Sequence, residues 1–254
     1  MKEEDYQKVN VFPTREEMGQ KAGKDVEQQI IKLLAHKKTI RMVFAAAPSQ
    51  NELLEYLVSS NKIEWERITA FHMDEYIGLN ANDSRSFATY LNEHLFYRVN
   101  FNKVYLINGK APVDEEVKRY SDLIAEAPVD IVCLGIGENG HIAFNDPPVA
   151  DFNDKEILKL VELDETCRIQ QVNEECFDTL DDVPREAFTL TIPVLMNADF
   201  LFCVVPGSSK SEAVYNTLNG PITTKCPASI LQSLSNCKFY FDQDSYSYTS
   251  NELK

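Results

Sequence analysis

Residues 129–148 read VDIVCLGIGENGHIAFNDPP, and this stretch decides the fold. Its opening, VDIVCL, is an almost unbroken apolar run, as in a strand that is buried on both faces of a parallel sheet. Glycines follow at 135, 137 and 140. A buried strand that runs directly into a glycine-rich turn is typical of an open α/β sheet, in which ligands bind beyond the carboxyl ends of the strands.

Strand-like and helix-like segments alternate on both sides of this stretch. The predicted strands cover residues 39–47, 68–74, 103–107, 129–137, 187–192, 200–207 and 238–242. The predicted helices cover residues 14–35, 49–59, 84–97, 114–126 and 208–218, and Thr14 with Glu17 predicts a capping box at the start of the first. This order predicts one domain over residues 1–254 with an α/β fold: a three-layer, Rossmann-like, mostly parallel sheet with helices on both faces.

The composition indicates a soluble protein and argues against several classes of partner. Hydrophobic residues make up 44% of the 254, and no apolar run reaches the roughly 18 residues of a membrane helix. The first residues, MKEEDYQKVN, lack the apolar core of a signal peptide, so we expect a cytoplasmic protein. The net charge of −15 argues against nucleic acid or membrane as partner. The six cysteines show no CxxC spacing, which argues against a disulfide framework or a zinc site.

The glycine-rich turn carries a candidate proton-transfer group. His141 follows Gly140 directly, and histidine is the usual acid/base near neutral pH. Asn139 and Asp146 lie close enough in sequence to orient its ring. The alternative is a glycine turn with an incidental surface histidine. The string GIGENG is not the dinucleotide fingerprint, so a dinucleotide cofactor is not expected.

A pair of carboxylates ends the second predicted strand. In FHMDEY, residues 71–76, Asp74 and Glu75 follow an apolar run, where burial would raise the pKa of a carboxyl group. Such a carboxylate suits the abstraction of a proton next to a carbonyl. The alternative is that Asp74 caps the following turn and that Glu75 is solvated.

Two further strand ends predict a site for an anion. In VVPGSSKSEAV, residues 204–214, Ser208 and Lys210 open a helix, where free N–H groups and the helix dipole attract negative charge. A lysine is disfavoured there unless an anion accompanies it, although a solvated lysine is the simpler alternative. In AAAPSQ, residues 45–50, Ser49 is predicted to cap a second such helix. These ends together predict a phosphate site.

Four motifs in the same order resemble the glucosamine-6-phosphate deaminase/isomerase family: HMDEYIGL, GENGHIAFNDP, AFTLTIPVLMNADFLFCVVPGSSK and CPASILQ. The resemblance implies conversion of an amino-sugar 6-phosphate to a ketose 6-phosphate with release of ammonia. It implies that Asp74 moves a proton from C2 to C1, that His141 opens the sugar ring, and that Asp146 orients His141. The Ser49 turn and Lys210 would hold the phosphate, with Glu75, Gly140 and Ser208 beside the substrate. No metal or organic cofactor is implied.

The sequence departs from the best-known members of that family at several positions. It has Asn139 where they have Asp, and Asp146 where they have Glu. Their glycine- and threonine-rich phosphate turn is replaced by AAAPSQ, and their phosphate-binding arginine is missing from IQQVNEE, residues 169–175. We expect Arg168 to be the candidate substitute.

The sequence supports three hypotheses about function. The leading one is a deaminase/isomerase acting on glucosamine 6-phosphate or galactosamine 6-phosphate. The second is a 6-phosphogluconolactonase-like hydrolase, although opening a lactone needs no base aimed at two neighbouring carbons. The third is a non-catalytic sugar-phosphate sensor, for which the chain has no basic DNA-binding segment. The partner is a small sugar phosphate in each case, and the sequence leaves a homo-oligomer open.

Overall fold

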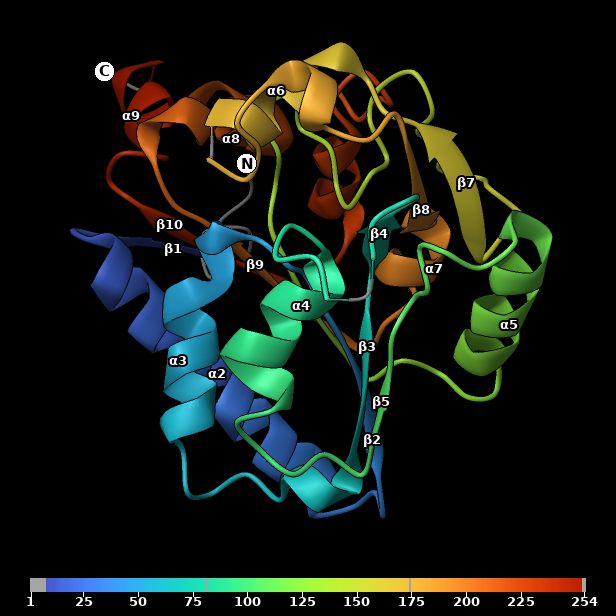
Figure 1. The fold of residues 1–254 in the computed structure, drawn as a ribbon. Coiled ribbons are helices and arrows are strands. Elements are labelled where there is room, and N and C mark those ends of the chain that lie inside the picture. The colour runs from blue at the N-terminus through green and yellow to red at the C-terminus, as the bar shows by residue number, and fades with distance from the viewer. Residues whose placement is uncertain (1–7, 81, 174, 253–254) are drawn as a thin grey trace.

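The structure, a computed structural model, describes residues 8–80, 82–173 and 175–252. Its main sheet has seven strands in the order β1-β10-β9-β6-β2-β3-β5, and every pairing between neighbours is parallel (Figure 1). The strands are β1 (Val9–Phe12), β2 (Ile40–Phe44), β3 (Ile68–His72), β5 (Lys103–Tyr105), β6 (Ile131–Leu134), β9 (Phe200–Val205) and β10 (Cys237–Asp242). The predicted parallel sheet is confirmed.

Helices cover both faces of this sheet, as predicted. One hydrophobic cluster joins the sheet to α2 (Arg15–Leu34), α3 (Asn51–Ser59) and α4 (Phe87–Leu91). A second joins the opposite face to α5 (Val113–Ala125), α7 (Ile192–Met196) and α8 (Ser211–Asn219). The central strand β6 is buried at all its positions, because helices pack against it from both sides. That burial accounts for the apolar run VDIVCL.

A small antiparallel sheet lies beside the main one and corrects two of the predicted strands. It contains β4 (Asp74–Tyr76), β8 (Glu186–Leu190) and β7 (Leu158–Glu162), with β8 in the middle. The strand predicted at 187–192 therefore belongs here and not to the parallel sheet. The strand predicted at 68–74 ends at His72, and Asp74 begins β4. Apolar composition predicts a strand but not its partner, so the sequence did not separate the two sheets.

The predicted start of the first helix is confirmed. Thr14 is the N-cap of α2, and its Oγ1 accepts a hydrogen bond of 3.2 Å from the backbone N–H of Glu17. The helix predicted at 84–97 is shorter than expected, because α4 spans Phe87–Leu91 and continues as a wider π-helical turn over Asn92–Phe96. The structure adds α6 (Glu165–Asn173) and α9 (Ser247–Glu252), as well as β1 and β7, for which no prediction was made.

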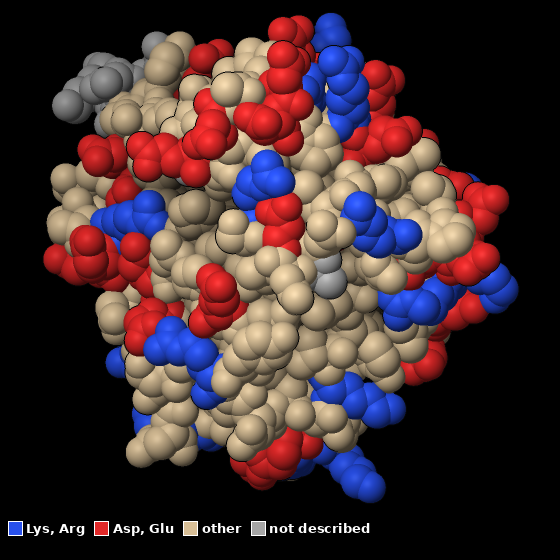
Figure 2. Space-filling model, viewed as in Figure 1, with Lys and Arg blue, Asp and Glu red and all other residues tan. Residues whose placement is uncertain are grey.

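The surface agrees with the acidic composition. Figure 2 shows Asp and Glu side chains spread over the visible face, with Lys and Arg side chains scattered between them. Of the helices in the described ranges, none combines the length and the apolar character that crossing a bilayer requires.

Two glycines allow α2 to approach α3 closely. A Cβ atom at Gly19 would lie 2.2 Å from Cβ of Glu52, and one at Gly23 would lie 2.6 Å from Cβ of Tyr56. No real pair of carbon atoms packs at these distances, so the helices are in contact because both positions lack a side chain.

We predict that Gly19→Ala destabilises the protein by about 1–3 kcal/mol through overpacking. In an uncrowded helix the same change would stabilise, since alanine is the better helix former by about 1 kcal/mol. Urea denaturation measures the difference, and Lys24→Ala at an exposed position of α2 is the control, expected within about 0.5 kcal/mol of wild type. A Gly19→Ala protein more stable than wild type would contradict the prediction.

Candidate active site

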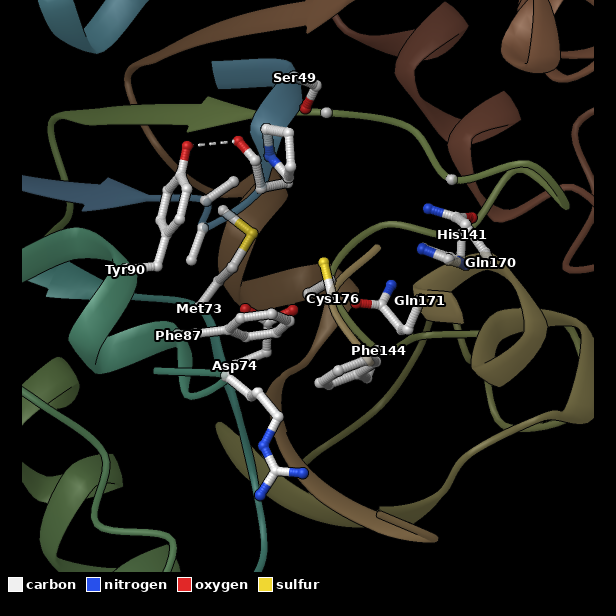
Figure 3. Close-up of a pocket in the computed structure, with 18 of the residues that line it drawn as sticks. Ser49, Met73, Asp74, Phe87, Tyr90, His141, Phe144, Gln170, Gln171 and Cys176 are labelled. Atoms are coloured by element: carbon white, nitrogen blue, oxygen red, sulfur yellow. Dashed lines mark hydrogen bonds between the residues drawn. The ribbon is translucent and has the colours of Figure 1, made fainter. Parts of the chain in front are cut away.

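A cavity of about 280 Å³ opens where the main sheet meets the small one. It lies beyond the carboxyl ends of β2, β3, β6 and β9, because the turns that follow these strands supply most of its wall. Of the residues predicted for the site, four line it: Ser49, Asp74, His141 and Lys210. Figure 3 shows the first three of these facing the open space.

Asp74 is held by the small sheet. It lies opposite Thr189 in the antiparallel pair β4–β8, and only 6% of its surface is exposed. Burial, with a contribution from the charge of Glu75, raises the pKa of Asp74 well above the usual value for a carboxyl group. The carboxylate is therefore a stronger base than a solvated aspartate, as predicted from its place after an apolar strand.

Glu75 performs a different task from the one expected. Strand alternation turns it away from the cavity, and its carboxylate accepts backbone N–H groups from Tyr76 (2.9 Å), Phe87 (3.1 Å) and Ala88 (2.8 Å). Burial raises the pKa of Glu75 to about 7 against the opposing effect of these hydrogen bonds. Glu75 thus anchors the start of α4, and the structure does not place it among the cavity-lining residues.

His141 is oriented by the turn that precedes it. Its backbone N–H donates to Oδ1 of Asn139 at 3.0 Å, and its Nδ1 lies 2.9 Å from Oδ1 of Asp146. Nδ2 of Asn139 donates to the same Asp146 oxygen at 2.8 Å. A Cβ atom on Gly137 would lie 2.2 Å from the imidazole, so the ring rests against bare backbone. Asp146 therefore meets the ring directly, whereas Asn139 supports it through the backbone and through Asp146, and neither residue is among those that line the cavity.

Asp146 is kept ionised by three neighbours. It is fully buried, which opposes ionisation, but the His141 ring, the Asn139 amide and the Cys167 thiol outweigh this and hold the pKa of the carboxyl below its usual value. The ligand atoms of His141, Asp146 and Cys167 lie within 4.8 Å of one another, a spacing that could hold a metal ion. Because the imidazole and the carboxylate already face each other at 2.9 Å and the Asn139 amide donates to the same carboxylate, direct contacts between these side chains account for the cluster.

Lys210 and Ser49 form the cationic end of the cavity. Lys210 is 6% exposed, and its Nζ lies 4.0 Å from Oε1 of Glu138. Ser49 was predicted to cap a helix, but it lies inside the short turn Pro48–Gln50 and its Oγ accepts a hydrogen bond from Gln50. The structure does not place Ser208 on the cavity wall, and the N–H of the neighbouring Gly207 donates to Asp242 at 3.0 Å.

The AAAPSQ turn is fixed from outside by other elements. The Tyr90 hydroxyl of α4 donates to the Ala47 carbonyl at 2.8 Å (Figure 3). Arg15 of α2 donates to the Pro48 carbonyl, and Nε2 of Gln50 donates to the Val204 carbonyl at 3.2 Å. The turn is therefore held in one conformation without the glycines that such turns often carry.

Two predicted substrate contacts lie elsewhere. Arg168 donates to the backbone carbonyls of Leu180 and Val183 and is not part of the cavity wall, so it does not take the place of the missing arginine. Gly140 adopts a φ of 82°, which glycine tolerates best, and its carbonyl accepts the N–H of Ala228 at 2.8 Å. Its contribution is to the shape of the turn.

Other residues reach the cavity without having been predicted. Those with polar or ionisable side chains are Ser84, Arg85, Ser86, Tyr90, Gln170, Gln171, Glu175 and Cys176. The two glutamines lie in IQQVNEE, the stretch in which the arginine of the family is missing. Their polar side chains at that place are the signal in the sequence that indicates a contact with substrate. Arg85 lies in the loop between β4 and α4, where the sequence carries no comparable signal.

The turn that carries His141 is bonded to the strand that faces Asp74. Nδ2 of Asn145 donates to the carbonyls of Ile142 and Leu190, both at 2.9 Å. The N–H of Phe144 donates to Oγ1 of Thr189 at 3.1 Å. Two segments far apart in the sequence are therefore locked together.

A buried basic carboxylate, an oriented imidazole and a buried lysine in one cavity can transfer protons on a small anionic molecule. The fold and the site thus define the class: an α/β protein suited to acid/base chemistry on a small anionic substrate. The comparisons give the family. A family model described as glucosamine-6-phosphate isomerases/6-phosphogluconolactonase matches residues 13–239, and the chain belongs to this family.

Relatives and solved structures agree with this assignment. The glucosamine-6-phosphate deaminase of Exiguobacterium sibiricum is 37% identical over 195 residues, 76% of this chain and 75% of the relative. The glucosamine-6-phosphate deaminase of Bacillus cereus strain B4264 is 35% identical over 246 residues, which cover 96% of this chain and 90% of the relative. A monomeric glucosamine-6-phosphate deaminase superposes with a TM-score of 0.85 at 29% identity, covering 95% of this chain and 99% of its own. The 6-phosphogluconolactonase of Thermotoga maritima shares the fold. It superposes with a TM-score of 0.76 at 19% identity, covering 92% of this chain and 98% of its own.

We predict that Asn145→Leu lowers the free energy of unfolding by about 1–3 kcal/mol, because two buried side-chain hydrogen bonds of about 0.5–1.5 kcal/mol each are lost. Chemical denaturation measures the change. Asn153→Leu, at an exposed position, is the matched control and is expected to stay close to wild type. Equal stabilities for the two variants would show that the Asn145 hydrogen bonds add nothing to the fold.

Proposed function

We propose that the chain is an amino-sugar-6-phosphate deaminase/isomerase, which converts glucosamine 6-phosphate or galactosamine 6-phosphate to the ketose 6-phosphate and ammonia. The observation that carries the proposal is the presence of Asp74, His141 and Lys210 on the wall of one cavity. The named relatives, similar over most of their length, support the same reaction.

Ring opening falls to His141. Its Nδ1 faces the ionised Asp146, so the opposite nitrogen, Nε2, is the one left to act on the substrate. The imidazole takes the proton of the anomeric hydroxyl and returns a proton to the ring oxygen, which frees the C1 aldehyde. Asp146 stabilises the charged imidazolium that exists between these two transfers.

Isomerisation falls to Asp74. Its carboxylate removes the proton from C2 of the open chain and returns it to C1. The proton that the C2 nitrogen gives up goes to the C1 oxygen, so the product carries a C1 hydroxyl and an imine at C2. Water adds to this imine and ammonia departs, so the products are a ketose phosphate and ammonia. A base with a raised pKa suits the abstraction of a weakly acidic proton, and one carboxylate can reach two neighbouring carbons.

Phosphate binding falls to Lys210 and to the turn that contains Ser49. The ammonium group supplies the charge, and the serine hydroxyl supplies a hydrogen bond. Because Tyr90, Arg15 and Gln50 already hold the turn, little ordering is needed when the anion binds.

The site favours this reaction over lactone hydrolysis. Hydrolysis of a lactone needs one general base for water, whereas this cavity adds a buried carboxylate suited to carbon acids. A pure sensor would need neither the raised pKa of Asp74 nor the oriented ring of His141. We further propose that the protein works in the cytoplasm on a free sugar phosphate, and size-exclusion chromatography will establish whether it forms a homo-oligomer.

We predict that one of the two amino-sugar phosphates gives ammonia and ketose phosphate in equal amounts. Asp74→Asn should lower kcat by about 10³-fold or more while the protein stays folded, since the amide cannot accept the C2 proton. Asp122→Asn on the exposed face of α5 is the control and should retain activity. No ammonia from either sugar would sink the proposed function.

We predict that the activity depends on the ionisation of Asp74. The base must be ionised to act, so kcat/KM should fall as pH drops through the raised pKa of Asp74, well above the ordinary aspartate value of about 3.9. Because the charge of Glu75 is one cause of that shift, Glu75→Gln should move the acidic limb of the profile to lower pH. An acidic limb near pH 4 in wild type, or one that Glu75→Gln moves upward, would contradict the assignment.

A further inference from the structure

Gln171 is a polar side chain on the cavity wall that the reaction steps above do not use. It lies in α6 and is 6% exposed, and Figure 3 shows its amide between Asp74 and His141 in that view. Burying an amide costs free energy unless its polar atoms have partners. Its position on the wall of the reaction cavity places it where a substrate can supply one of those partners.

The orientation of this amide is fixed. The Tyr76 hydroxyl donates to Oε1 of Gln171 at 2.8 Å. Tyr76 is fully buried, and its ring packs against three phenylalanine rings at centroid distances of 4.8, 5.2 and 5.3 Å: Phe87, Phe144 and Phe177. Since the oxygen is committed to Tyr76, the nitrogen is the amide atom that turns to the cavity. The site thus presents a donor of defined direction.

The neighbouring amide has another role. Oε1 of Gln170 accepts the backbone N–H of Glu138 at 2.9 Å, so this side chain supports the turn that carries His141. The two glutamines line the same cavity, but one is tied to the catalytic turn and the other to the buried tyrosine beside Asp74.

We propose that Gln171 is a specificity-determining residue that donates a hydrogen bond from Nε2 to a substrate hydroxyl at C3 or C4. This inference rests on the proposed function. Asp74 fixes the C1–C2 end of the open chain and Lys210 fixes the C6 phosphate, so the carbons between these anchors are C3, C4 and C5. An epimer at C3 or C4 turns its hydroxyl away from a fixed donor and leaves that donor unpaired, and an unpaired buried donor discriminates strongly between substrates.

The test compares three substrates on wild type and Gln171→Leu. They are glucosamine 6-phosphate, its C4 epimer galactosamine 6-phosphate and its C3 epimer allosamine 6-phosphate. Leucine keeps the volume of the side chain but cannot donate. We expect kcat/KM for the preferred sugar to fall roughly tenfold or more. For each epimer, the epimer ratio is kcat/KM for glucosamine 6-phosphate divided by kcat/KM for that epimer. We expect one of these two epimer ratios to move toward one by a similar factor. The ratio that collapses identifies the hydroxyl.

Two variants separate this role from a structural one. Tyr76→Phe removes the anchor of the amide and should reduce the same epimer ratio, to a smaller extent. Gln170→Leu should lower turnover of every sugar alike and leave both ratios unchanged, because it acts through the His141 turn. A folded Gln171→Leu enzyme whose two ratios stay within twofold of wild type overturns the proposal, as does a wild type that does not discriminate between the sugars. Wild type without turnover of any of the three sugars would instead refute the proposed function.

Discussion

Thr189 of β8 lies opposite Asp74 in the small sheet, and its Oγ1 accepts the N–H of Phe144 at 3.1 Å. Thr189 therefore contacts both the strand that carries the base and the turn that carries the imidazole, and it links the two inside the protein. The seven-stranded sheet alone would not fix their distance, because Asp74 has already left it. Catalysis on adjacent carbons tolerates only small errors of position, so the second sheet is part of the catalytic machinery.

The site places three carboxylates in three electrostatic environments. Asp74 is buried beside another carboxylate and becomes basic, Glu75 is buried but held by backbone N–H groups, and Asp146 is buried among donors that keep it ionised. Their pKa values are thus spread apart by position, although the side chains are chemically almost the same. The base, the anchor of α4 and the support of His141 are distinguished in this way.

The sequence predicts most of this architecture and about half of the site. Apolar runs that end in glycine or charged residues predicted the central strands, and strand ends predicted Ser49, Asp74, His141 and Lys210, since these signals are local. Glu75 and Arg168 were assigned to substrate from the family resemblance, but both side chains are bonded to backbone groups instead. Whether a buried charge meets a ligand or a peptide group depends on tertiary packing, which no local pattern contains. The same limit explains why β8 was assigned to the wrong sheet.

The charge of the molecule has a consequence for how substrate arrives. A sugar phosphate that approaches a protein of net charge −15 meets repulsion at long range, and attraction begins only near Lys210 and Arg85, the cationic residues among those described on the cavity wall. Physiological salt limits that repulsion to a distance of about 8 Å. Association should therefore become faster as ionic strength rises, the reverse of the behaviour of enzymes that steer their substrates electrostatically.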